Sequence, residues 1–286
     1  MCSRSQEARS RSRTSSSASR DVSCVTDDVV PLQGRSVAAP TWSSSLKVLL
    51  RADTTAQLRT SLSLVLTFAL PLILLVATGL GKNSAVLGGP AFRISLALTV
   101  GLVSIGTVGY SLAIARDRDT GVFQRLRVTP APSWTIMVSR WIVQLGAVLV
   151  MAIVVLVVAA VFVGITLRPQ NYLFTVLIAL LGSAVFLSIG QAIVGLIASA
   201  DTLNAAGRLL YVPLIGLSLF GDSDRLGTTV ELVSRWSPGG CLETLLSAAM
   251  GATAWSGQSW GALFASTGYT LLFAVIGIRW FQWGAR

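Results

Sequence analysis

Residues 141–166 read WIVQLGAVLVMAIVVLVVAAVFVGIT and contain no charged side chain. An α-helix rises about 1.5 Å per residue, so a helix of about 20 apolar residues crosses the roughly 30 Å hydrocarbon core of a bilayer. Hydrocarbon offers no partners for free backbone groups, and a helix satisfies them within one segment. This stretch therefore predicts a membrane-spanning helix and decides the class of the fold.

Further apolar segments of similar length lie before and after this stretch. One of them contains Asn204, Arg208 and Pro213 and is the weakest, because two of these residues are polar and the third interrupts a helical hydrogen-bond ladder. Together the segments predict an all-α polytopic membrane protein with six transmembrane helices. The expected ranges are 61–80, 94–115, 141–166, 172–199, 203–220 and 261–281.

The composition agrees with this class. Of the 286 residues, 53% are hydrophobic and 12% are charged, and the mean hydropathy is +0.71, whereas a soluble chain carries about a quarter charged residues. The sequence has no histidine, and its three cysteines form no CxxC pair, which excludes His-based catalysis and the usual zinc patterns. We therefore expect no catalytic residue, no metal site and no cofactor bound by this chain.

The basic residues are unevenly placed. The chain has 22 Lys and Arg against 12 Asp and Glu, and most of the basic ones lie before residue 61 or between Arg116 and Arg140. They form no folded basic face with interleaved aromatic residues, so nucleic-acid binding is not expected. With six spans and an inner amino terminus, 17 basic residues fall inside and five outside. The positive-inside rule then predicts a multi-pass protein of a bacterial-type cell membrane with both termini in the cytoplasm.

The chain before the first span divides into two parts. Residues 1–40 are rich in Ser and Arg and predict a disordered cytoplasmic tail, with an organelle transit peptide and a misread start codon as open alternatives. The rest, 41–286, is expected to form one membrane domain. Its first part has leucines near helical spacing from Leu46 to Leu58, which predicts an interfacial elbow helix; the alternative is the first turns of the next span.

The inner loop 116–134 reads RDRDTGVFQRLRVTPAPSW. Asp119 and Thr120 suit the N-cap of a short helix that presents Phe123 on its apolar side, and Pro130 ends such a helix. A short amphipathic helix with an exposed aromatic side chain predicts docking on another protein. The alternative is a basic loop that only fixes topology.

The run D-R-D-T-G-V-F-Q-R-L-R-V-T-P at 117–130 resembles the first cytoplasmic loop of the ABC-2 type transporter permeases, especially the daunorubicin-resistance-like drug exporters. Val122 stands where that pattern usually has Thr, and Gln124 where it often has Glu. The resemblance extends to the elbow segment and to 232–251 before the last span. The matching positions of the loop are Gly121, Arg125, Leu126, Arg127, Val128, Thr129 and Pro130.

The resemblance implies a permease that exports an amphiphilic or hydrophobic substrate (a drug, a lipid or a lipid-linked product) from the cytoplasm or inner leaflet. Such permeases pair, so a second copy or a paralogue and membrane lipid are the expected neighbours. ATP and Mg²⁺ belong to a separate ABC ATPase subunit, and this sequence contains no G-x-x-x-x-G-K. In the family the loop helix docks on that ATPase. The implied coupling residues are Gly121, Val122, Phe123, Arg125, Leu126, Arg127, Thr129 and Pro130.

Further expectations concern the loops. Arg118 lies on the flank of the loop helix, and its replacement is expected to affect coupling much less than that of Phe123. Cys241 lies in the outer loop 221–260, where we expect exposure to thiol reagents. This loop has apolar residues at helical spacing on both sides of a break at 237–240. The resemblance implies re-entrant helices there, and the alternative is helices lying flat on the outer leaflet.

Few polar side chains lie inside the expected spans. Hydrocarbon cannot satisfy a polar group, so such side chains face protein or a water-filled path. The candidates for a substrate path are Tyr110, Gln144, Gln191 and Tyr211, with helix packing as the alternative role. Close helix contact is expected at Gly101, Gly106, Gly109, Gly182, Gly190 and Gly195. A non-transporting six-span scaffold and a secondary carrier stay open as functions, although a carrier normally uses a carboxylate near mid-membrane.

Overall fold

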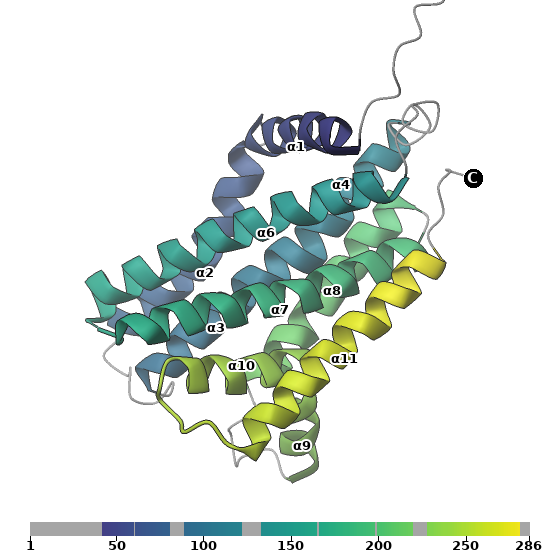
Figure 1. Cartoon of the computed structure of the whole chain (residues 1–286). Helices are drawn as coiled ribbons and strands as arrows, with labels where there is room; N and C mark the ends of the chain where they lie inside the picture. The colour runs from purple at the N-terminus through teal and green to yellow at the C-terminus, as the bar shows by residue number, and fades with distance from the viewer. Residues whose placement is uncertain are drawn as a thin grey trace, which may run out of the picture. The chain divides into compact units, whose positions relative to one another are not determined.

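The computed structural model describes residues 42–59, 61–80, 89–121, 133–164, 166–197, 199–219 and 228–280, and every secondary-structure element in these ranges is a helix (Figure 1). The expected tail 1–40 lies outside the described residues. The helices are α1 (Trp42–Arg59), α2 (Ser61–Leu80), α3 (Pro90–Val103), the π-helix η1 (Ser104–Gly109), α4 (Tyr110–Asp119), α6 (Ser133–Val158), the π-helix η2 (Ala159–Val163), α7 (Pro169–Leu196), α8 (Ala200–Leu219), α9 (Thr228–Trp236), α10 (Pro238–Ala249) and α11 (Gly257–Arg279).

Four helices are long and apolar enough to cross a bilayer. They cover Pro90–Asp119, Met137–Phe162, Pro169–Leu196 and Gly257–Arg279. The apolar stretch Thr67–Gly79 of α2 is shorter than these four helices, and α8 is not among the four. The all-α membrane class is therefore confirmed, whereas the count of six spans stays a prediction.

The second expected span is longer than predicted. The range 94–115 was expected, and the helix runs without interruption through α3, η1 and α4, from Pro90 to Asp119. Hydropathy marks only the apolar part of a helix, and here the helix continues through charged residues beyond that part. It begins with Pro90 in its first turn, where proline loses no helical hydrogen bond, and is followed by Gly121 with a φ of 70°.

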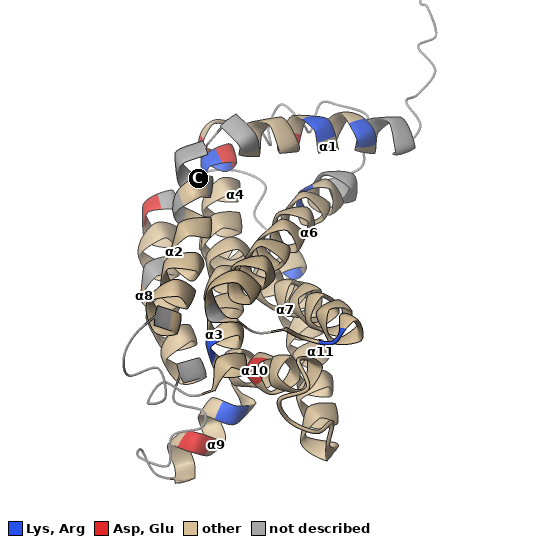
Figure 2. Ribbon diagram, turned by 90° about the vertical axis from the view of Figure 1, so that its left-hand side faces the viewer, with Lys and Arg blue, Asp and Glu red and all other residues tan. Residues whose placement is uncertain are grey.

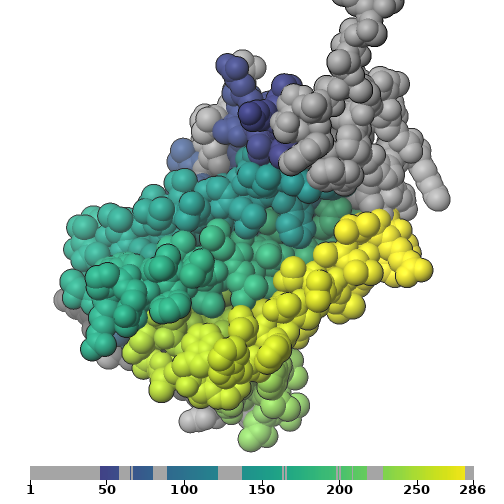
Figure 3. Space-filling view, in the orientation of Figure 1, coloured from purple at the N-terminus to yellow at the C-terminus, as the bar shows by residue number. Residues whose placement is uncertain are grey.

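The centre of the fold is α7, which packs against α11, η1 and α6. A Cβ atom added at Gly190 would lie 2.5 Å from the carbonyl oxygen of Gly106, and one added at Gly277 would lie 2.8 Å from the Gln191 carbonyl carbon. Small residues let helix backbones approach in this way. Figure 3 shows α11 along the outer side of α7, with much of its apolar surface exposed.

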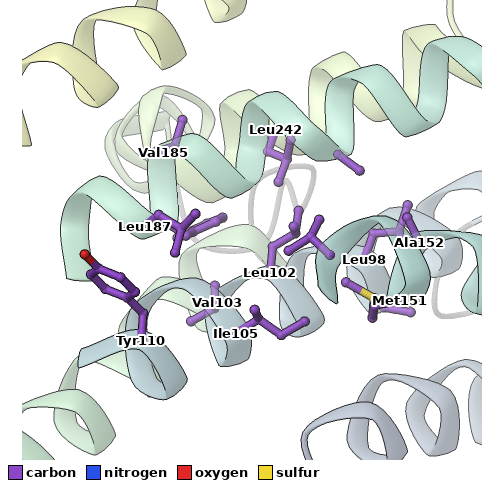
Figure 4. Close-up of a cluster of buried hydrophobic side chains, with 14 of the residues drawn as sticks. Leu98, Leu102, Val103, Ile105, Tyr110, Met151, Ala152, Val185, Leu187 and Leu242 are labelled. Carbon is purple, nitrogen blue, oxygen red and sulfur yellow. The ribbon is translucent and has the colours of Figure 1, made fainter. Parts of the chain in front are cut away.

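The helix α10 is inserted among the long helices. Leu242 and Leu246 are buried in the main hydrophobic cluster, and Figure 4 shows Leu242 beside the side chains of α3 and α7. A Cβ atom at Gly182 would lie 2.7 Å from Leu242. α10 is therefore packed among other helices, whereas α9 keeps exposed apolar side chains such as Leu232; the placement of both helices relative to the membrane stays a prediction.

The expected break at 237–240 is shorter than predicted. Ser237 is the only residue between α9 and α10, and Pro238 to Gly240 already belong to the first turn of α10. The Ser237 hydroxyl accepts a hydrogen bond from the Gly240 N–H at 3.1 Å. An N-cap residue followed by proline is a favourable start for a helix. Residues 237–240 therefore begin α10 and do not form a separate loop.

Side chains of neighbouring helices bond the carbonyl groups at several helix ends. Arg93 Nη1 donates to the Thr78 carbonyl near the end of α2 at 3.1 Å, and Asn171 Nδ2 donates to the Met250 carbonyl after α10 at 2.9 Å. The last carbonyls of a helix have no partner within it, so these bonds satisfy groups that hydrocarbon would leave unpaired. Similar bonds run from Ser234 to Leu217 in α8 and from Tyr269 to Trp236 in α9.

The close contact at Gly190 makes a testable prediction. Gly190→Ala puts a methyl group against the backbone of Gly106, so α7 and η1 must separate, and overpacking of this kind costs about 1–3 kcal/mol. We expect a lower unfolding temperature in detergent. The matched control is Gly146→Ala on α6, where an added Cβ meets nothing within 4 Å. Equal unfolding temperatures for the two variants would contradict the prediction.

Candidate functional site

A cavity of about 250 Å³ lies between α1, α2, η1, α4 and α6. It is at the end of the helix bundle where α1 lies across the other helices, near the end of α4 and the beginning of α6 (Figure 1). The lining mixes charged, amide, phenolic and apolar groups. It comprises Asp53, Ala56, Gln57, Thr67, Phe68, Ile105, Gly109, Tyr110, Leu112, Ala113, Arg116, Asp117, Arg140, Val143, Gln144 and Ala147.

Two hydrogen bonds join α1 to α6 at the cavity. The Ser139 hydroxyl donates to Asp53 Oδ2 at 2.7 Å, and Gln57 Nε2 donates to Gln144 Oε1 at 3.0 Å. Asp53 and Gln57 are four residues apart and therefore lie on the same face of α1. The side of α1 that faces α6 carries partly buried leucines and, beside them, the polar residues Asp53 and Gln57. α1 is therefore held to α6 by side-chain hydrogen bonds as well as by apolar contact.

An ion pair joins α4 to α6 at the same place. Arg140 Nη2 lies 2.5 Å from Asp117 Oδ2, with both side chains partly buried. Removing one partner of such a pair costs more than removing one partner of an exposed pair, because the remaining charge stays poorly solvated. Asp117 is near the end of α4 and Arg140 is in the second turn of α6, so the pair closes the base of the loop between these helices.

The four candidates for a substrate path take different places. Tyr110 and Gln144 line the cavity. The Tyr110 hydroxyl donates to Gln191 Oε1, so Gln191 supports the cavity wall from α7 without lining it. The Tyr211 hydroxyl lies 2.9 Å from the Ser104 hydroxyl, which joins α8 to η1. The structure therefore brings three of the four residues together around the cavity and gives Tyr211 a helix contact.

Arg118 has a structural role that its expected place on the flank of the loop helix did not suggest, whereas its effect on coupling stays a prediction. Its side chain is only 3% exposed, and it donates from Nη1 to the Ile197 carbonyl at 3.0 Å and from Nη2 to the Val194 carbonyl at 3.1 Å. These carbonyls end α7, where a positive charge also complements the helix dipole. Arg118 therefore holds the end of α4 to the end of α7.

Of the proposed coupling residues, the structure describes Gly121 alone. Its φ of 70° ends α4, and its N–H donates to the Arg118 carbonyl at 3.1 Å. The Thr120 hydroxyl donates back to the Arg116 carbonyl at 2.9 Å and Thr120 caps the end of α4, whereas the helix that Thr120 was expected to begin lies outside the described residues. The coupling residues outside the described part are Val122, Phe123, Arg125, Leu126, Arg127, Thr129 and Pro130.

The charged residues of the described helices lie mainly near the helix ends (Figure 2). At the α1 end, Asp53, Arg116, Asp117 and Arg140 all line the cavity. Sequence reasoning did not identify these residues, although Arg140 and Gln144 are four apart at the start of an apolar helix. Polar residues four apart indicate a polar face on a helix, but they do not show which other helix packs against that face.

Cys241 does not have the exposure expected of it. The residue is fully buried among α10 and its neighbours, and burial raises the pKa of the thiol to about 11. Thiol reagents attack the thiolate, so both burial and the raised pKa make Cys241 unreactive. Within the described ranges, no group of three or more Cys, Asp or Glu side chains is arranged to hold a metal ion.

Comparison with known families gives one result. Residues 44–250 match the model of the family described as ABC-2 type transporter. The matched range includes α1 from its third residue on, all residues that line the cavity, the loop after α4, and α10. No curated protein matches the chain.

The contacts of Arg118 predict a large effect on stability. Arg118→Ala removes two charge-assisted hydrogen bonds and leaves buried carbonyls at the end of α7, which typically costs about 2–3 kcal/mol. Arg116→Ala is the control, because Arg116 is two residues earlier and exposed. We expect Arg118→Ala to unfold in detergent at a clearly lower temperature than Arg116→Ala. The assignment is wrong if Arg118→Ala unfolds at the temperature of Arg116→Ala.

Proposed function

The chain belongs to the ABC-2 type transporter family and is therefore a membrane permease of an ABC transporter; from this premise we propose that it exports an amphiphilic or hydrophobic substrate out of the cytoplasm or inner leaflet. The observation that carries the proposal is the cavity beneath α1. Its walls combine charged and amide groups with apolar side chains such as Phe68, Ile105 and Val143. A site of this kind suits a molecule with a polar end and an apolar end.

We propose that ATP is hydrolysed by a separate ABC ATPase subunit, with ATP and Mg²⁺ bound there. Permeases of this family normally work with such a subunit, and the sequence contains no phosphate-binding G-x-x-x-x-G-K. The loop 121–130 is the proposed docking segment. It starts where Gly121 ends α4, and the helices on its two sides are joined by Asp117 and Arg140. A second permease copy or a paralogue and membrane lipid complete the proposed assembly.

Coupling is tested in proteoliposomes that contain the chain with its copurified ATPase. The chain alone should hydrolyse no ATP, whereas the complex should show substrate-stimulated hydrolysis and export. Phe123→Ala should weaken ATPase binding by about tenfold or more, because loss of an aromatic anchor typically costs about 2 kcal/mol. The matched control is Phe264→Ala, which removes an aromatic side chain that is 72% exposed on α11. Export by Phe123→Ala at the unmutated rate would eliminate the docking role of the loop.

We also propose that both termini are cytoplasmic in a cell membrane, because the basic residues divide 17 to five between the two sides. Cysteine labelling tests this in a chain whose Cys2 and Cys24 are replaced by Ser. Ala252→Cys, exposed after α10, should react with an impermeant thiol reagent in intact cells. Ala52→Cys, exposed on α1, should react only after permeabilisation, and buried Cys241 should stay silent. The reverse pattern would invert the topology.

A further inference from the structure

The cavity beneath α1 carries charges of both signs. Arg116 and Arg140 line it together with Asp53 and Asp117. Arg140 and Asp117 form an ion pair with each other, so Arg116 and Asp53 are the two charges that remain for a ligand. We propose that the cavity binds the headgroup of a phospholipid with a primary ammonium, with the phosphate at Arg116 and the ammonium at Asp53.

Arg116 suits the phosphate. Its side chain is exposed, and among the described residues the structure gives its guanidinium no hydrogen bond or ion pair. A guanidinium presents several donors in a planar fork that matches phosphate oxygens, and such charge-assisted bonds are about twice as strong as neutral ones. Arg116 can therefore take a phosphate without breaking any contact within the described part of the chain.

Asp53 suits the ammonium. Among the described residues its carboxylate accepts one hydrogen bond, from Ser139 at 2.7 Å, and two carboxylate oxygens together offer about four acceptor positions. A primary ammonium has three donors and can use the remaining positions, whereas a quaternary ammonium has none. No ion pair joins Asp53 to a basic side chain in the described helices, so no cation of the described residues competes with a ligand there.

The balance of charges selects against other headgroups. A purely anionic headgroup bound at Arg116 would also meet Asp53 and Asp117, and a purely cationic one at Asp53 would also meet Arg116 and Arg140. Like charges in one site cost several kcal/mol and act as selectivity against the wrong partner. A zwitterion matches both signs, and the apolar wall that includes Phe68 and Leu112 accepts the carbon skeleton behind the headgroup.

The position of the cavity suits a lipid source. α1 has exposed Lys47 and Arg51 on one side and partly buried leucines on the other, the pattern of a helix that lies in the membrane interface. The cavity that α1 covers is then at the depth of lipid headgroups. This inference deepens the proposed function and rests on it for the placement in a membrane, but lipid binding requires neither ATP nor the ATPase.

Lipid retention tests the proposal on the full-length chain. The chain is placed in nanodiscs that contain phosphatidylethanolamine, phosphatidylcholine and phosphatidylglycerol in equal amounts, and retained lipid is counted by native mass spectrometry. We expect phosphatidylethanolamine to be retained over each of the others by roughly tenfold, as two charge-assisted contacts allow. Arg116→Gln and Asp53→Asn should each remove that preference. The matched controls Arg51→Gln and Asp119→Asn change exposed residues outside the cavity and should keep it.

The unmutated chain alone can overturn the proposal. Equal retention of phosphatidylcholine and phosphatidylethanolamine, or a preference for phosphatidylglycerol, would exclude a primary-ammonium site. A preference unchanged by Arg116→Gln and Asp53→Asn would place the lipid elsewhere. Glycerophosphoethanolamine, which has the same headgroup without acyl chains, should compete at least tenfold more weakly, and equal binding would exclude a lipid as the occupant. ATP-driven export without lipid preference would overturn this inference and leave the proposed function standing.

Discussion

The carbonyl groups at the ends of the helices are the constraint on which the rest of this structure depends. In hydrocarbon no water can bond them, and a free carbonyl there costs several kcal/mol. The chain satisfies them with side chains from other helices: Arg93 bonds the end of α2, Arg118 the end of α7, and Asn171 the end of α10. These three helices therefore end where a neighbour supplies a donor, and the bonds help to fix how the helices are placed along one another.

Contact between small residues then fixes how closely the helices approach. The contact of Gly190 with Gly106 brings the backbones of α7 and η1 together, and the Thr107 hydroxyl donates to the Phe186 carbonyl at 3.3 Å across this contact. Gln191 follows Gly190 and thereby meets Tyr110, which follows η1. The position of Gln191 beside the cavity wall is thus a consequence of the close packing of the two backbones. The π-helical turn of η1 falls at this contact, a position typical of π-bulges near functional sites.

The apolar runs predicted the helices well, since α2 has the expected bounds 61–80 and α11 lies within four residues of 261–281 at its start. The site was only partly predictable. Tyr110 and Gln144 are visible as polar residues inside apolar runs. Asp53 and Gln57 cannot be recognised from the sequence in this way, because each bonds a residue more than 80 positions away. In addition, a polar side chain on an interfacial helix is usually solvated. Local spacing shows that a face is polar but does not show which helix meets it.

Arg118 and Asp117 show how the end of α4 is connected. Adjacent in sequence, they point to different neighbours: Arg118 bonds α7, and Asp117 pairs with Arg140 of α6. α6 is hydrogen-bonded in turn to α1. A continuous series of side-chain contacts therefore runs from the end of α4 through α6 to α1, along the wall of the cavity. The bonds of Arg118 reach two carbonyls of the central helix, whereas the Asp117 pair is more exposed. The end of α4 is therefore joined both to the central helix α7 and to α6, which forms the polar wall of the cavity together with α1.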